Sequence, residues 1–199
     1  MKHSGLWRDG LLLLIAVTAL LLALFLPAAY ALSEEWRADE QALLEAKRTG
    51  RIIRLHIIAN SDSAADQAVK YAVRDEILRS FGESFSHCST FEEVYSALLS
   101  NMDLMKCTAL RTARSLGFDG DIKTEAGVMD LPAKQYGKVF LPQGKYHALR
   151  ITLGKGEGKN WWCVLYPQLC LAASETKDDT DHIHLTSRRI FSKWLAFCK

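Results

Sequence analysis

Two cysteines and two histidines are the residues of this chain whose types best suit nucleophilic chemistry. They are Cys163, Cys170, His56 and His147. A thiolate forms once a nearby imidazole takes the proton, so one such pair would suit a secreted hydrolase acting at the cell wall. Both cysteines lie in the run WWCVLYPQLC, however, and a thiol buried among such side chains is inert. In an exported protein, a disulfide between Cys163 and Cys170 is the alternative, provided that Pro167 reverses the chain.

Two further patterns resemble ligand sites but lack parts that the chemistry needs. His182 and His184 stand beside several aspartates, yet a metal ion would need another ligand from elsewhere in the chain. Residues 154–160, GKGEGKN, resemble a phosphate loop, but Leu153 and Asn160 stand where a glycine and a magnesium-binding Ser or Thr belong. We therefore expect neither a metal site nor any other cofactor.

The overall composition excludes some classes of protein. The 199 residues carry a formal net charge of +2, without the basic excess that is typical of nucleic-acid-binding proteins. The cysteines include no C-x-x-C pair of the kind that zinc modules use. We expect one compact domain and no nucleic-acid partner.

The N-terminus has the three-part organisation of an export signal. Basic residues precede an apolar stretch at residues 11–26, and the sequence AYA at residues 29–31 follows Pro27 as an A-x-A cleavage motif. A retained membrane anchor is the alternative, because the apolar segment reaches the roughly 20 residues that cross a bilayer. Under both interpretations the rest of the chain is exported.

The elements that must position these residues are expected to form an α+β domain with a two-layer α/β arrangement. A mixed sheet of about four strands packs against two main helices. Alternating or clustered β-branched and aromatic residues predict the strands, at residues 51–59, 122–128, 146–153 and 161–166. Capping residues followed by apolar positions at helical spacing predict helices from Ser33, from Ser63 and over residues 90–116. The Pro- and Gly-rich residues 130–144 are predicted to be a long surface loop.

The C-terminal region ends in a basic amphipathic helix that Ser187 would cap. Its apolar stripe either docks on the sheet or rests on an anionic membrane surface. The predicted organisation is a signal or anchor at 1–31, a connecting helix at 32–50, a globular domain at 51–172, and an acidic linker with the C-terminal helix at 173–199.

Two long motifs carry a resemblance to a known family. The first is RLHIIANSDS at residues 54–63, continued by Asp66-Gln67, Val69-Lys70, Val73-Arg74-Asp75 and Ile77-Leu78. The second has Leu141-Pro142, Gly144, Tyr146, Ala148-Leu149-Arg150, three alternate glycines from Gly154, and NWWCVLYP at residues 160–167. In this order the motifs resemble the signature of stage II sporulation protein R. The sequence departs from the family pattern at Gln168, where the family has a second proline.

The resemblance implies a signalling protein of endospore formation rather than an enzyme. Members are exported across the forespore membrane into the intermembrane space and trigger a membrane-bound aspartic-type protease of the mother cell. That protease then processes the precursor of sigma factor E. The expected partners are therefore this protease and, through the C-terminal helix, a membrane surface.

The polar residues of the first motif have two interpretations. They either cap the connection between a strand and a helix, or form a surface that the protease recognises. The candidate partner-binding residues are Arg54, His56, Asn60, Ser61, Asp62, Arg74 and Asp75.

Overall fold

The computed structural model describes residues 4–167, so the expected acidic linker, C-terminal helix, Cys170, His182 and His184 lie outside the described residues. Its contacts divide the chain into two compact units, Met1–Ala38 and Asp39–Lys199. The elements in chain order are α1 (Ser4–Thr49), β1 (Ile53–Ile58), α2 (Ala64–Ser86), α3 (Phe91–Ser100), α4 (Met102–Ser115), β2 (Ile122–Leu131), β3 (Lys134–Tyr136), β4 (Val139–Leu141), β5 (Gly144–Leu153) and β6 (Asn160–Tyr166).

The first unit consists of the N-terminal part of α1. Leu14–Ala31 is long and apolar enough to cross a membrane by length and composition, a test that a signal sequence also passes. Large apolar side chains such as Leu20 and Phe25 are exposed along it. The helix continues through Pro27, as apolar segments in membranes often do. This segment therefore suits either a signal or an anchor.

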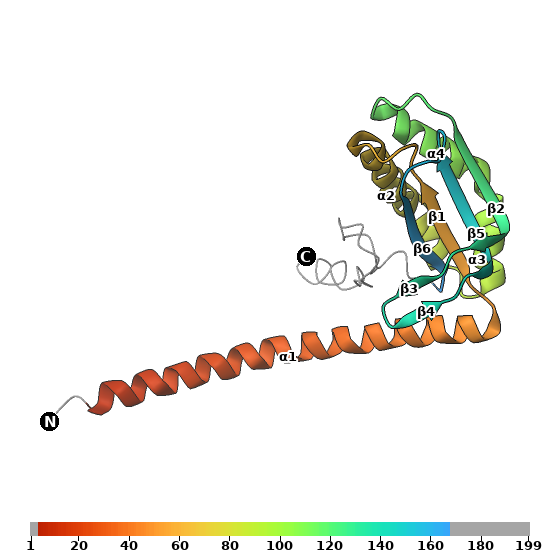
Figure 1. Cartoon of the computed structure of the whole chain (residues 1–199). Helices are drawn as coiled ribbons and strands as arrows, with labels where there is room; N and C mark the ends of the chain where they lie inside the picture. Colours follow the sequence, from red (N-terminus) through yellow and green to blue (C-terminus); the bar gives the residue numbers. More distant parts are fainter. Residues whose placement is uncertain (1–3, 168–199) are drawn as a thin grey trace. The chain divides into compact units, whose positions relative to one another are not determined.

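The second unit is built on a mixed four-stranded sheet with the order β2-β5-β1-β6. Strands β1 and β5 run parallel, whereas β1 with β6 and β2 with β5 are antiparallel. Figure 1 shows α2, α3 and α4 packed on the same side of this sheet. The sequence-based prediction of an α+β fold with a mixed sheet of about four strands is confirmed.

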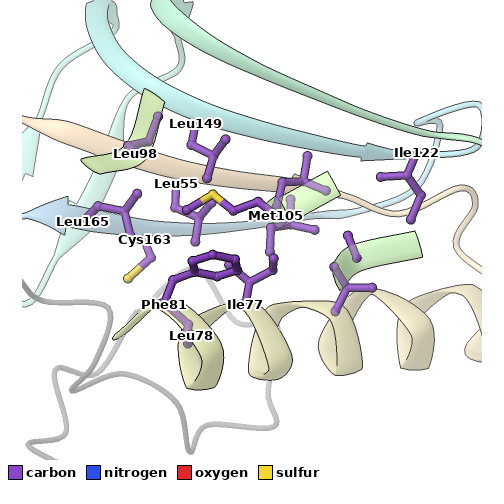
Figure 2. Packing of buried hydrophobic residues seen from close by; sticks show 14 of the residues in the cluster. Leu55, Ile77, Leu78, Phe81, Leu98, Met105, Ile122, Leu149, Cys163 and Leu165 are labelled. Carbon is purple, nitrogen blue, oxygen red and sulfur yellow. The ribbon is translucent and has the colours of Figure 1, made fainter. Parts of the chain in front are cut away.

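Alternation along β1 separates the core from a second, polar face. Ile53, Leu55 and Ile57 are fully buried beneath the helices, and complete burial of each such side chain stabilises the fold by about 1.5–3 kcal/mol. In Figure 2, Ile77 and Phe81 of α2 approach Leu55 from below. Because neighbouring residues point to opposite faces, Arg54 and His56 lie on the other side of the sheet.

The prediction of a long surface loop over residues 130–144 is wrong. β2 extends to Leu131, and β3 and β4 pair with each other as a two-stranded ribbon that lies at one end of the sheet (Figure 1). Tyr136, Val139 and Leu141 of this β3–β4 ribbon are buried against Leu43 and neighbouring residues near the end of α1. The apolar pattern of the ribbon is only three residues long on each strand, too short for a periodicity to stand out.

The prediction of one helix over residues 90–116 is also wrong, because Asn101 separates α3 from α4. Its side-chain amide donates to the carbonyl of Ala97 at 2.7 Å, and this competing hydrogen bond helps to end α3. The predicted helix starts at Ser63 and Thr90 are confirmed, whereas the predicted start at Ser33 is wrong because α1 continues through this residue. Ser63 caps α2, and Thr90 with Glu93 forms a capping box at α3.

Candidate partner-binding site

The structure distributes the seven candidate residues over three places. Asn60, Ser61 and Asp62 form the turn between β1 and α2, and Arg74 and Asp75 lie in the middle of α2. Arg54 and His56 point away from α2, on the sheet face that we call the ribbon face because the β3–β4 ribbon covers one end of it. The seven residues therefore do not form one continuous surface.

The turn at residues 60–62 is held by hydrogen bonds to α2. The Asn60 amide and the Ser61 hydroxyl both donate to one carboxylate oxygen of Asp66, at 2.8 and 2.5 Å. These bonds stabilise the ionised carboxylate and hold the pKa of Asp66 below its ordinary value. The backbone N–H of Asp66 donates to the Ser63 hydroxyl at 3.1 Å, which completes the cap.

The same turn also anchors the hairpin between β5 and β6. Asn60 Oδ1 accepts from the backbone N–H of Lys155 at 3.0 Å, and Asp62 Oδ1 accepts from that of Lys159 at 2.6 Å. Gly158 N–H donates to the carbonyl of Ala59 at 2.9 Å. The two motifs of the sequence, about ninety residues apart, thus form one hydrogen-bonded connection at the end of β1.

Two glycines of the hairpin are required by this close approach. A side-chain carbon at Gly154 would lie 2.2 Å from Asn60 Oδ1, at a backbone φ of +54° that favours glycine. At Gly158 it would lie 2.2 Å from the Ser61 carbonyl oxygen. The spacing GKGEGK therefore serves the packing of the hairpin on the turn, which explains the glycines without a phosphate ligand.

Arg54 is fully buried on the ribbon face and has no carboxylate partner among the described residues. Its Nη1 donates to the carbonyl of Pro132 at 3.0 Å, while Nε and Nη2 have no hydrogen-bond partner. Its guanidinium carbon lies within 5.0 Å of the ring centres of Tyr146 and Trp162, and 5.8 Å from that of Tyr136. Burial raises the pKa of Tyr136, and the charge of Arg54 partly opposes this shift.

His56 lies next to Arg54 on the same face. Its ring stacks on Trp162 with a centroid distance of 3.7 Å, and neither ring nitrogen has a partner in hydrogen-bond geometry. Burial lowers its pKa from 6.5 to about 4, an effect that the nearby amide of Asn160 partly offsets. The imidazole is therefore neutral at physiological pH.

Arg74 is the second buried arginine of the motif, and it has an anionic partner. It forms an ion pair with Asp75 at 2.8 Å, and its guanidinium carbon lies 4.8 and 5.3 Å from the ring centres of Tyr71 and Trp161. The side chain of Asp75 is 56% exposed, so the pair reaches solvent at the surface of α2.

The residues suggested for a thiol hydrolase do not come together. Cys163 is buried in the core beneath the helices, whereas His56 points to the ribbon face. His147 packs edge-on against Phe91 and Tyr95. Cys88 and Cys107 are not disulfide-bonded, and the pairing of Cys163 with Cys170 stays a prediction because Cys170 lies outside the described residues.

Within the described part of the chain, the candidate residues belong neither to a metal site nor to the cleft beside the end of α1. Within residues 4–167, no group of His, Cys, Asp and Glu side chains is arranged to hold a metal ion. A cleft of about 550 Å³ lies beside the end of α1, lined in part by Glu45, Arg51, Cys88 and Tyr166. Its lining includes none of the seven candidate residues.

Sequence reasoning missed the residues that surround Arg54. Tyr136 lies in the segment predicted to be a loop, and Tyr146 and Trp162 are expected in strands and in the second motif but not as neighbours of Arg54. The strand registers pair Arg54 with Ala148 and Val164, which brings the flanking aromatic residues within reach. The alternation of polar Arg54 and His56 within a hydrophobic strand was the available signal for a second, specialised face.

Comparison with known proteins agrees with the signature. The family described as stage II sporulation protein R matches residues 49–176. The chain is similar to stage II sporulation protein R of Bacillus subtilis (strain 168), with 38% identity over 118 residues, which is 59% of this chain and 53% of that protein. It thus spans about half the length of this curated relative, and no solved structure gives a significant match. Because the family match covers well over half of its residues, the chain belongs to the stage II sporulation protein R family.

Proposed function

We propose that this protein is an exported signal of endospore formation that activates a membrane-bound aspartic-type protease of the mother cell. The protease in turn processes the precursor of sigma factor E, and this protein carries no catalytic site of its own. Family membership over residues 49–176 is the observation that supports the proposal most strongly.

Two features of the chain are compatible with this role. The apolar stretch Leu14–Ala31 suits an export signal or an anchor, so that the globular unit would act in the space between the forespore and mother-cell membranes. The separation of Cys163 from His56 by the sheet gives the alternative thiol hydrolase no support. A partner that supplies the chemistry fits this arrangement better.

Co-expression in a bacterium that does not sporulate tests the proposal. The full chain, the protease and the sigma factor precursor are produced together, and precursor cleavage is followed by immunoblotting. We expect cleavage that requires all three proteins and that stops when a catalytic aspartate of the protease is changed to asparagine. Cleavage at the same level without this chain would contradict the proposed activation.

A further inference from the structure

The ribbon face holds most of the unpartnered buried polar atoms found among the described residues. Arg54 contributes Nε and Nη2, His56 contributes both ring nitrogens, and Tyr136 and Asn160 contribute one oxygen each. Buried polar groups normally have hydrogen-bond partners, and each exception calls for an explanation. These atoms lie close together on adjacent strands and the ribbon, so one explanation should account for them.

Burial of Arg54 has the largest free-energy cost in this group, because its side chain is charged. A buried charge without an opposite charge destabilises a fold unless other interactions compensate for it. The three aromatic rings supply attraction to the cation, but aromatic faces cannot accept the two in-plane N–H groups. The hydroxyl of Tyr136 lies near the guanidinium but outside hydrogen-bond geometry, so both N–H groups remain unpartnered. The missing partner is therefore an acceptor that meets a guanidinium along its edge, and a carboxylate has that geometry.

The neighbouring charges on the ribbon face also favour an anion. Arg150 lies on β5 opposite His56 and forms an ion pair with Glu125 at 2.8 Å. With this pair neutralised and His56 uncharged, the positive charge of Arg54 remains without compensation. A single carboxylate from outside the described residues would balance it.

The β3–β4 ribbon is the cover that such a carboxylate would have to displace. Its two strands pair with each other and with no strand of the four-stranded sheet. Moving the ribbon away from Arg54 would break no ladder of the main sheet, but it would break the hydrogen bond to Pro132 and the contact with Tyr136. It would also take the buried apolar side chains of the ribbon out of their cluster with the end of α1. Access to the guanidinium therefore leaves the four-stranded sheet intact, and the contacts of the partner must offset the apolar burial that the ribbon loses.

We propose that Arg54 binds a carboxylate side chain of a partner protein, which reaches the guanidinium when the β3–β4 ribbon shifts away from it. The inference rests on the proposed function, because we take this partner to be the protease. It assigns to the protease an acidic residue in the segment that contacts this protein. His56 and Trp162 complete the wall of the site beside Arg54.

The co-expression assay with two matched arginine variants tests this inference. Arg54→Met removes the charge, and we expect roughly thirty-fold less precursor cleavage, or lower still, at limiting amounts of the full chain. Arg54→Lys keeps the charge without the planar fork and should fall between Arg54→Met and the wild type. Arg79→Met, which changes an exposed arginine of α2 that already pairs with Glu76 and is not a candidate partner-binding residue, should retain wild-type cleavage.

Each outcome of this assay decides a different claim. Wild-type cleavage with Arg54→Met, at an equal protein level, would overturn the carboxylate site alone. If Arg54→Met does not accumulate while Arg54→Lys is fully active, Arg54 serves the fold and the inference fails. No cleavage with the wild-type chain would overturn the proposed function and the partner named here.

One further variant distinguishes the partner from the chain's own acidic segment. In it, Glu175→Gln, Asp178→Asn, Asp179→Asn and Asp181→Asn are combined in the full chain. We expect its cleavage activity to equal that of the wild type. A loss as large as that of Arg54→Met, with no further loss when both changes are combined, would place an intramolecular carboxylate at Arg54 and overturn the inference.

Discussion

The polar residues within β1 and those in the turn that follows it differ in their hydrogen bonding. In the turn, Asn60 and Asp62 accept hydrogen bonds from the backbone of the β5–β6 hairpin, and the turn is tied to α2. In the middle of the strand, Arg54 and His56 are buried with most of their polar atoms unpartnered. The hydrogen bonds of the turn account for its residues by folding alone. Folding gives no comparable account of Arg54, which is why we assign recognition to the ribbon face.

The largest expected effect comes from disturbing the turn. Gly158→Ala would place a carbon 2.2 Å from the Ser61 carbonyl oxygen and push the hairpin away from the turn. We expect a loss of about 2–4 kcal/mol in the free energy of unfolding, measured by urea denaturation of the full chain in mild detergent. Gly144→Ala is the control, because the added carbon would meet only Tyr146 at an ordinary 3.7 Å. Equal stability of the two variants would contradict the interlocked turn.

A second effect follows from the burial of His56. Its pKa falls from the ordinary 6.5 to about 4 on folding. Between these two pH values the unfolded state therefore binds the proton more readily than the folded state. The contribution of neutral His56 to the free energy of unfolding is fully present above pH 6.5 and is lost as the pH falls towards 4. In this range the free energy of unfolding changes by up to about 1.4 kcal/mol per pH unit.

His56→Phe provides the matched measurement, since a phenyl ring can keep the stacking on Trp162 but cannot titrate. We expect the difference in unfolding free energy between the wild type and this variant to change between pH 7 and pH 4. A difference that stays constant over this range would show that His56 is not buried in its neutral form.

A smaller effect is expected at the paired arginine. Arg74→Met removes the ion pair with Asp75 and the contacts with Tyr71 and Trp161. Asp75 can be solvated because its side chain is half exposed, so the loss should be about 1 kcal/mol in thermal or urea unfolding. A loss as large as that of Gly158→Ala would mean that Arg74 has a larger structural role than its contacts indicate.

The local features of the fold could be predicted from the sequence, whereas the long-range ones could not. The Ser63 and Thr90 caps and the four main strands depend on residues close together in the chain, and all of them are confirmed. The β3–β4 ribbon depends on burial against α1, which no local pattern reveals. The break at Asn101 is the exception among the local features, because the hydrogen bond of its side chain to Ala97 interrupts an otherwise continuous helical spacing of apolar residues.

The candidate site shows the same limit. The residue types at positions 60–62 predicted a capped turn, but the hydrogen bonds of this turn to Lys155 and Lys159 join residues 95 and 97 positions apart. The aromatic surroundings of Arg54 come from three separate elements, so they became visible only with the strand registers. The sequence therefore identified the polar residues but could not separate those that serve the fold from those available to a partner.

The most direct test of this separation is the unfolding free energy of Arg54→Met in the full chain. Replacing a buried unpaired charge by an apolar side chain of similar length is often neutral or stabilising. We therefore predict a stability within about 1 kcal/mol of the wild type, or higher, in urea denaturation monitored by circular dichroism. A loss of about 3 kcal/mol or more would show that the guanidinium makes interactions on which the fold depends, which would contradict the account and assign Arg54 to the fold.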